Sequence, residues 1–202
     1  MRRSLYAIAA FAMLFAGAYA QRPAPTADLG KKAPDFQLRD AVTGKQYSLS
    51  QVLRAKGTKA VVVMFIATDC PVSNSYNDRM VSLAKQYGPK GVRFLAINAN
   101  ATEPLQKVAA HAKEHGFPFP VLKDEDSAVA DAYAAQATPH VYVLDSAGVL
   151  RYRGRIDDNM NPNAVKTHDL ADALNAVLAG QPVARADTKA FGCSIKRRVA
   201  QR

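Results

Sequence analysis

Two cysteines are the residues of this chain best suited to carry chemistry. Cys70 follows the apolar run AVVVMFI of residues 60–66 and immediately precedes Pro71. Because proline suits the first position of a helix, this order predicts a cysteine at the junction between a buried strand and a helix. Free backbone amides and the helix dipole favour the nucleophilic thiolate there, whereas Asp69 disfavours it if its carboxylate points toward the sulfur. A small buried residue at a crowded junction is the alternative.

The second cysteine, Cys193, lies in the tail segment FGCSIK of residues 191–196. It can act with Cys70 only if the tail folds back across the domain, where the apolar Phe191 and Ile195 could pin it. A domain of roughly 150 to 180 residues buries about 70% of the surface that its unfolded chain exposes, so it needs no staple. The cysteines are therefore a candidate redox pair, with a permanent disulfide or an unrelated thiol as alternatives.

The elements that must position these cysteines follow from hydrophobic periodicity and turn signals. The run 60–66 predicts a central strand buried on both faces, and apolar spacings of three and four predict a helix over 71–87. A βαβ unit, a helix, a β-hairpin and a final helix, with an extra hairpin in front, predict a thioredoxin-like α/β fold: a central mixed sheet flanked by helices. The other predicted elements are a hairpin over 36–49, a strand over 91–98, helices over 50–55, 104–115, 127–135 and 165–178, and two antiparallel strands within 140–156.

Thr138-Pro139 is the third feature, because a proline here enters an apolar strand from a loop. Such a proline is often cis and leaves the preceding carbonyl free to accept, although an ordinary turn proline also fits. In a thioredoxin-like fold this loop lies opposite the junction cysteine. His140 would then lie at the margin of the sulfur, where it could favour thiolate, move a proton or bind metal, or it would face solvent.

The N-terminus predicts export. Residues 1–20 carry Arg2 and Arg3, an apolar stretch and the ending Ala18-Tyr19-Ala20, which is typical of a signal peptide cleaved near Ala20. A retained anchor helix is the alternative. We expect a periplasmic or secreted protein. The predicted regions are a signal peptide (1–20), a linker (21–33), a thioredoxin-like redoxin domain (34–182) and a basic tail with Cys193 (183–202).

The formal net charge of +10 falls to +8 without Arg2 and Arg3, and five further positives lie in the tail, so the body carries about +3. A nucleic-acid binder would need a basic stripe interleaved with aromatics on one face, and an exported protein rarely meets nucleic acid, so we exclude that class. The tail is suited to weak contact with a membrane surface or an acidic partner.

Two clusters raise the question of metal binding. Asp157-Asp158-Asn159 resembles a cation-binding turn, but adjacent polar residues in a loop are usually solvated. Cys70, His140, Met160 and His168 would form a soft set of copper ligands. Thioredoxin-fold copper chaperones, however, typically carry Cys-x-x-x-Cys, and position 74 is Asn74 here. We expect no metal and no cofactor, and keep a copper or thiol carrier without turnover as the alternative function.

Phe65 to Pro71, Thr138-Pro139 and Tyr142 to Asp145 resemble the redoxin branch of the thioredoxin superfamily, the alkyl hydroperoxide reductase and thiol-specific antioxidant group. The likeness is to its exported peroxiredoxin-like members with a Cys-Pro-x-Ser site and a Gly-Cys-x-Ile-Lys tail, and it covers about 31–196. The resemblance implies that Cys70 is the nucleophile, that Ser73 replaces the second cysteine of Cys-x-x-Cys, and that Pro139 is cis.

The chain departs from peroxiredoxins at two places. Ala67 stands where they keep Thr or Ser, with Thr68 one step late, and Pro139 stands where they keep an Arg. Arg155 is the candidate substitute. Peroxide is therefore expected to be a poor substrate.

Together these features predict an exported thiol oxidoreductase. Cys70 would attack a disulfide or a peroxide, and Cys193 or an external thiol would resolve the product. The expected partners are a thiol or disulfide protein or a small-thiol reductant. The residues expected to support the site are Thr68, Pro71, Ser73, Thr138, Pro139, His140 and Arg155.

Overall fold

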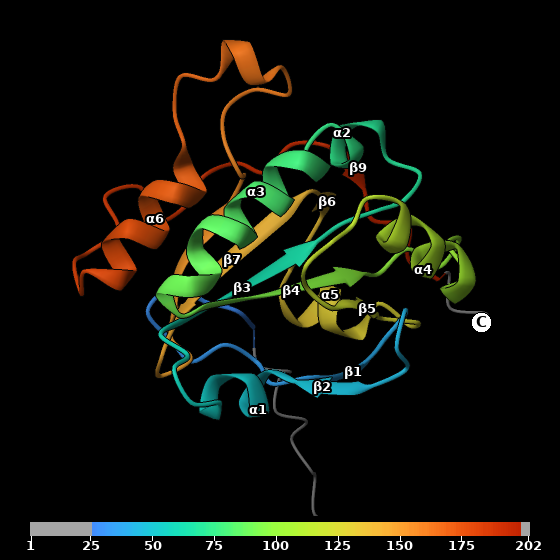
Figure 1. Cartoon of the computed structure of the whole chain (residues 1–202), viewed down its shortest axis with the longest axis horizontal. Coiled ribbons are helices and arrows are strands. Elements are labelled where there is room, and N and C mark those ends of the chain that lie inside the picture. The colour runs from blue at the N-terminus through green and yellow to red at the C-terminus, as the bar shows by residue number, and fades with distance from the viewer. Residues whose placement is uncertain (1–25, 199–202) are drawn as a thin grey trace, which may run out of the picture.

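The computed structural model describes residues 26–198, so the predicted signal peptide, the start of the linker and the end of the tail lie outside the described residues. One mixed sheet has the strand order β2-β1-β5-β4-β3-β7-β8, and β6 and β9 form a separate two-stranded sheet (Figure 1). The strands are β1 Gln37–Asp40, β2 Gln46–Ser48, β3 Ala60–Phe65, β4 Val92–Asn98, β5 Val121–Lys123, β6 Ala137–Thr138, β7 His140–Asp145, β8 Leu150–Gly154 and β9 Cys193–Ser194. The helices are α1 Leu49–Arg54, α2 Pro71–Asn74, α3 Asn77–Tyr87, α4 Leu105–Glu114, α5 Ala128–Ala132 and α6 Asp169–Leu178, with short 3₁₀ helices at Gly88–Lys90 and Pro162–Ala164.

Strand β3 lies inside the sheet, between β4 and β7. It pairs in parallel with β4 and antiparallel with β7, and all six of its residues are buried. Successive side chains of a strand point to opposite faces, so Val62 and Met64 enter one core cluster and Val61 and Val63 enter the other. Burial on both faces is what an unbroken apolar run requires, and it fixes the position of the loop that leads to Cys70.

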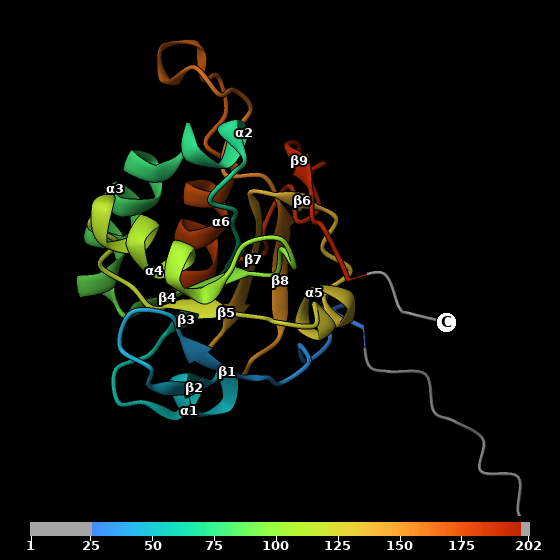
Figure 2. The same cartoon turned by 90° about the vertical axis from the view of Figure 1, so that its right-hand side faces the viewer.

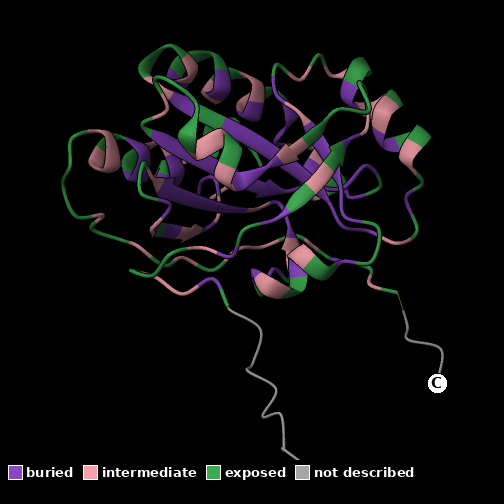
Figure 3. Ribbon diagram, turned by 90° about the horizontal axis from the view of Figure 1, so that it is seen from below, coloured by how far each residue is buried: buried purple, intermediate pink, exposed green. Residues whose placement is uncertain are grey.

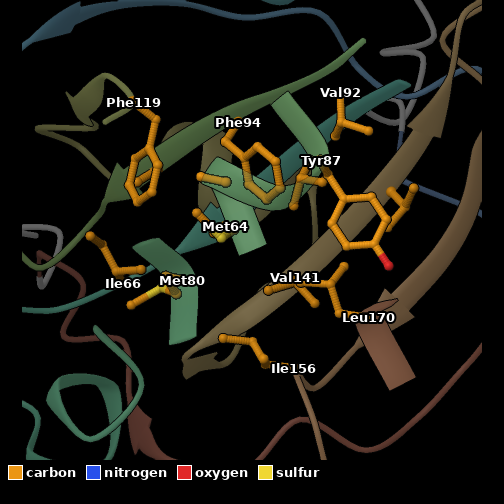
Figure 4. Close-up of a cluster of buried hydrophobic side chains, with 14 of the residues drawn as sticks. Met64, Ile66, Met80, Tyr87, Val92, Phe94, Phe119, Val141, Ile156 and Leu170 are labelled. Carbon is orange, nitrogen blue, oxygen red and sulfur yellow. The ribbon is translucent and has the colours of Figure 1, made fainter. Parts of the chain in front are cut away.

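Helices cover both faces of the sheet (Figures 1 and 2). Helices α3, α4 and α6 pack over the face that carries Met64, where Met80, Phe94 and Leu170 are among the buried side chains (Figure 4). Helices α1 and α5 pack on the other face. Figure 3 shows the buried residues concentrated in the sheet between these layers. Each fully buried side chain of this kind contributes about 1.5–3 kcal/mol, so the core holds the site without a disulfide.

The predicted elements are present, with differences at β5, at the unpredicted β6-β9 pair, at the start of α6 and within the helix predicted over 71–87. The front hairpin, the central strand and the antiparallel β7-β8 pair form as expected. Strand β5, which pairs with β4 and β1, was not predicted, because three residues are too few to show periodicity. Helix α6 begins at Asp169, four residues later than the predicted start, because the backbone of Val165 is extended (φ −66°, ψ 127°) after the 3₁₀ turn Pro162–Ala164.

The predicted helix over 71–87 is divided into α2 and α3. Ser75 donates its hydroxyl to the Val72 carbonyl at 2.7 Å, and back-bonding of this kind bends helices. Tyr76 follows with φ −102° and ψ −4° and buries its ring. The short α2 therefore carries Cys70 on a different axis from α3.

The segments on either side of the predicted domain pack against it. Residues 26–33, assigned above to the linker, bury Ala27, whose amide donates to the Ala132 carbonyl. In the tail, the amide of Thr188 donates to the Arg153 carbonyl. The tail thus folds back across the domain, as a partnership between the two cysteines requires. Within residues 26–198, no helix combines the length and the apolar character needed to cross a membrane.

Candidate active site

Cys70 caps the start of α2. Figure 1 shows α2 above the upper end of the sheet. Its thiol accepts a hydrogen bond from the amide of Ser73 at 3.2 Å and donates to the carbonyl of Thr138 at 3.3 Å. The side chain is only 2% exposed. The strand-to-helix junction predicted from sequence is present, and it holds the sulfur between a backbone donor and the loop that contains the cis Thr138-Pro139 bond.

Strand β9 brings Cys193 to the same place. Thr138 pairs with Cys193 in the β6-β9 ladder, and the Ile195 amide donates to the Gln136 carbonyl at 3.0 Å. Figure 2 shows β9 beside β6 next to α2. The two side chains lie close enough for each to shift the pKa of the other. Two cysteines that are far apart in sequence are thus neighbours, and both are present as free thiols.

Two apolar side chains pin the tail, as the sequence suggested. Phe191 packs edge-on against Tyr76 with ring centroids 6.2 Å apart, and Ile195 is buried in the core cluster that contains Phe65. Between them, Gly192 lies so close to the Thr138 carbonyl that no Cβ would fit. The tail is therefore seated by shape complementarity on both sides of Cys193.

The pKa values of the two thiols are shifted in opposite directions. Burial raises the pKa of Cys70, but hydrogen bonding from the side chains of Cys193 and Thr138 and from the Ser73 amide outweighs it, so the pKa lies below its ordinary value. The hydrogen bond with Cys70 raises the pKa of Cys193, and burial adds to this effect. Cys70 is therefore the more acidic thiol of the pair.

Asp69 does not oppose this arrangement. Its carboxylate forms an ion pair with the ammonium of Lys107 on α4, with Nζ 2.7 Å from Oδ2. The charge that could have raised the pKa of the neighbouring thiol is thus neutralised at the surface.

Thr68, Ser73 and Asn74 organise the loop before Cys70. Ser73 is fully buried, and its hydroxyl accepts from the Ala67 amide at 3.2 Å, which makes it a brace for the loop. The carbonyl of Thr68 accepts from Asn74 Nδ2 at 2.9 Å, while its hydroxyl is buried without a hydrogen-bond partner in the described part of the chain. Pro71 occupies the first turn of α2, as predicted.

His140 lies close to the site in sequence, but its ring is directed to a different neighbour. Its Nδ1 is 3.2 Å from the Tyr142 hydroxyl, and the two rings are 4.6 Å apart. Burial, with a smaller contribution from the charge of Arg153, lowers the pKa of His140 to about 4. The imidazole is therefore neutral, and it belongs to a cavity shared with Tyr142 and Arg153.

Arg155, the candidate substitute for a peroxide-binding arginine, is held elsewhere. Its Nε donates to the Asp169 carboxylate at 2.8 Å, and Thr167 lies within reach of its Nη2. The guanidinium braces the start of α6.

The copper set suggested by the sequence is not assembled. His168 lines a cavity with Leu83 and Ile156, away from the cysteine loop, and Met160 is exposed. Asp157, from the acidic turn, is engaged by the Tyr76 hydroxyl and by Arg79. No group of three His, Cys, Asp or Glu side chains suited to a metal occurs within the described ranges.

Glu103 is a residue of the site that sequence reasoning missed. It is fully buried, and its carboxylate accepts hydrogen bonds from the amides of Thr68 and Asp69 and from the side chains of Asn98 and Asn100. Burial raises the pKa of this carboxyl, but those four hydrogen bonds outweigh it and hold the pKa below its ordinary value. A signal existed: polar residues at 98, 100 and 103 follow a strand parallel to the one that ends before Cys70.

A low-pKa thiol capping a helix, a second thiol beside it and a cis proline across from both, on this fold, define a thioredoxin-fold thiol oxidoreductase. The AhpC/TSA family model matches residues 29–153. The chain is 30% identical over 140 residues to the thiol-disulfide oxidoreductase ResA of Geobacillus thermodenitrificans, a match that spans 69% of this chain and 75% of that protein. The chain belongs to the AhpC/TSA family, among the redoxins of the thioredoxin superfamily.

Solved structures agree with this placement. An uncharacterized conserved protein from Geobacillus kaustophilus is 37% identical with a TM-score of 0.80, covering 87% of this chain and 95% of that one. A hypothetical protein from Sinorhizobium meliloti is 34% identical with a TM-score of 0.77, covering 86% and 96%. These structures confirm the predicted fold, and the family model and the thiol-disulfide oxidoreductase relatives confirm the predicted family and thiol oxidoreductase class.

Proposed function

We propose that this protein exchanges disulfides with partner proteins through a cycling Cys70–Cys193 pair, outside the cytoplasm. The observation that carries the proposal is the β6-β9 pairing, which seats Cys193 against Thr138, whose carbonyl accepts from the Cys70 thiol at 3.3 Å. Ser73 cannot act as a second redox residue, so a resolving thiol must come from elsewhere in the chain or from outside it.

The first step uses the acidity of Cys70. Its thiolate attacks one sulfur of a partner disulfide; that bond breaks, a mixed disulfide forms on Cys70, and the departing partner thiolate takes up a proton. The Ser73 amide stabilises the attacking thiolate at 3.2 Å.

The second step uses Cys193. Its pKa is raised chiefly because it is hydrogen-bonded to Cys70, and that cause disappears once Cys70 is bound in the mixed disulfide. Cys193 then loses its proton and attacks the Cys70 sulfur, releasing the reduced partner. The partner has gained two electrons and two protons, and the pair ends as a disulfide that an external thiol reductant returns to the dithiol.

The proposed location rests on the leader-like pattern of residues 1–20, and the proposed partners rest on the thiol-disulfide oxidoreductase relatives. An oxidising compartment is where disulfides persist in proteins and where an exchange enzyme has substrates. The basic residues that follow Cys193 suit weak contact with an acidic partner or a membrane surface.

The test is non-reducing peptide mapping after the reduced protein is titrated with oxidised glutathione. The expected product is a peptide pair linked through Cys70 and Cys193. In Cys193→Ser, Cys70 is expected to remain as a mixed disulfide with glutathione, because no internal thiol resolves it.

A matched control moves the second thiol by one residue. In Cys193→Ser/Ser194→Cys the thiol lies on the opposite side of β9, so no linked pair should form. Wild-type protein in which Cys70 is oxidised while Cys193 stays free would overturn the proposed pair and leave a one-cysteine site that depends on external thiols.

A further inference from the structure

Glu103 is a fully buried carboxylate to which the proposed exchange assigns no role. Burying a charge is costly unless it is fully hydrogen-bonded, and all four contacts of this carboxylate come from amide donors. We therefore expect the Glu103 carboxylate to be needed for the placement of the segments to which it is hydrogen-bonded.

One side of the carboxylate holds the loop that leads to Cys70. Oε2 accepts from the Thr68 amide at 2.9 Å, and Oε1 accepts from the Asp69 amide at 3.1 Å. Asp69 is the residue directly before Cys70, so these two hydrogen bonds fix the position of the backbone that carries the Cys70 side chain.

The other side holds the tail through Asn100. The Asn100 side chain donates to Glu103 Oε1 at 2.8 Å and accepts from the Lys196 amide at 2.8 Å. The Lys196 carbonyl in turn accepts from the Ala101 amide at 2.8 Å. Lys196 lies three residues after Cys193, on the segment that β9 anchors.

A buried cation completes the network. Lys123 Nζ donates to Asn98 Oδ1 at 3.0 Å and to the Asn100 carbonyl at 2.7 Å. Both asparagines are therefore oriented by Lys123 on one side and by Glu103 on the other, which leaves the carboxylate little freedom to move.

We propose that Glu103 is a positioning residue that sets the placement of both thiols at once, holding Cys70 directly through its loop and Cys193 through Asn100 and Lys196. The proposal rests on the Cys70–Cys193 exchange proposed above. It assigns to one buried side chain the alignment of two segments that are distant in sequence.

The pKa of Cys70 distinguishes a positioning role of Glu103 from a simple effect of its negative charge. Removing a nearby negative charge lowers the pKa of a thiol, whereas displacing the thiol from the Ser73 amide and its other donors raises it. A positioning role for Glu103 therefore predicts a rise when the carboxylate is lost.

The experiment compares Glu103→Gln with wild type by two measurements. The equilibrium constant of the Cys70–Cys193 disulfide against glutathione should fall about tenfold, the effect of one lost hydrogen bond to a charged group. In a Cys193→Ser background, the pH midpoint of Cys70 alkylation should rise. Glu125→Gln, on an exposed glutamate, is the matched control and should change neither.

A second variant separates the two arms. Asn100→Ala frees the tail but leaves the contacts to Thr68 and Asp69, so it should lower the equilibrium constant and leave the alkylation midpoint unchanged. It also takes the place of Glu103→Gln if that variant does not fold; an unchanged equilibrium constant in Asn100→Ala then overturns the proposal.

Other results of these measurements would overturn either the positioning role of Glu103 or the proposed exchange. A folded Glu103→Gln with both quantities unchanged, or with a lowered midpoint, overturns the positioning role. If wild type forms no internal disulfide, the proposed exchange fails, and the alkylation midpoint alone decides whether Glu103 positions Cys70.

Discussion

A buried thiolate is stable only where donors replace water, and Cys70 meets this condition with short-range contacts. The sulfur is almost completely enclosed, yet it faces the Ser73 amide, the Cys193 thiol and the Thr138 side of the cis-proline loop. The ion pair between Asp69 and Lys107 removes the one adjacent charge that would have worked against it. At the scale of single residues, the site is built to make one thiol acidic and the other its proton-bearing partner.

The first prediction concerns that acidity. Iodoacetamide alkylation of Cys70, followed by mass spectrometry of its peptide, should show a pH midpoint below the free-cysteine value of about 8.5. Cys193→Ala should raise the midpoint because it removes a donor to the sulfur, and Cys193→Ser, which keeps a hydroxyl donor, should raise it less. A wild-type midpoint at or above about 8.5 would contradict the assignment of Cys70 as the thiolate.

The second prediction is that peroxide is a poor substrate. Ala67 and Pro139 replace the residues that would polarise a peroxide, and Arg155 is bound to Asp169. Stopped-flow oxidation of the reduced protein by hydrogen peroxide should be no faster than that of a small free thiol at the same pH. Arg155→Lys should leave the rate unchanged; a slower rate in this variant would mean that the guanidinium reaches the substrate after all.

At the scale of elements, the sequence predicts those strands and helix ends that depend only on neighbouring residues. The run 60–66 is a buried strand, and a cysteine followed by proline caps a helix, because each depends on neighbouring residues only. The division of the helix at Ser75 and Tyr76 depends on a side-chain back-bond and on burial of the Tyr76 ring, which no periodicity contains.

The candidate site shows the same limit. The helix-capping place of Cys70 follows from local sequence, the resemblance to redoxins implies the cis Pro139, and the tail anchors Phe191 and Ile195 could be named in advance. The role of Glu103 could not, because its hydrogen-bond partner Thr68 is distant in sequence and becomes a neighbour only when β3 and β4 pair in parallel. Likewise, only the register of β6 against β9 shows that Cys193 reaches Cys70.

The third prediction tests the β6-β9 pairing. A methyl group at Gly192 would overlap the Thr138 carbonyl, and the residue also has φ of 149°, so Gly192→Ala should lift the tail from β6. The yield of the Cys70–Cys193 disulfide should drop while the core stays folded. Gly180→Ala, with φ of 67° and no atom near the added methyl, is the control for replacing a positive-φ glycine without overlap and should leave the yield unchanged. Equal yields in the two variants would show that the seating of the tail does not control the exchange.

At the scale of the whole molecule, the site depends on segments contributed by distant parts of the chain. The loop before Cys70, the turn that contains Glu103, the cis-proline loop and the tail meet only in the folded domain. The same tail also crosses β8, where Arg153 bonds to Asp187 and lies beside the cavity of His140. Conditions that destabilise the fold are therefore expected to act on the thiol pair as well.

The fourth prediction follows from His140, whose pKa burial and the charge of Arg153 lower to about 4, with Asp187 acting weakly the other way. An unfolded histidine has a pKa near 6.5, so between about pH 6.5 and 4 the unfolded chain binds a proton that the folded chain does not. The free energy of unfolding should thus fall as the pH is lowered through this window, by about 2 kcal/mol between pH 7.5 and 5 from His140 alone.

Glu103 adds little there, because a carboxyl with a lowered pKa loses its contribution only at more acidic pH. His111, whose pKa is also lowered by burial, adds a loss of the same sign, so the difference between wild type and a variant isolates His140 better than the slope itself. Urea unfolding at the two pH values should show a smaller loss in His140→Gln than in wild type. Equal losses in wild type and His140→Gln would mean that the imidazole is accessible to protons in the folded protein, and that its cavity opens to water.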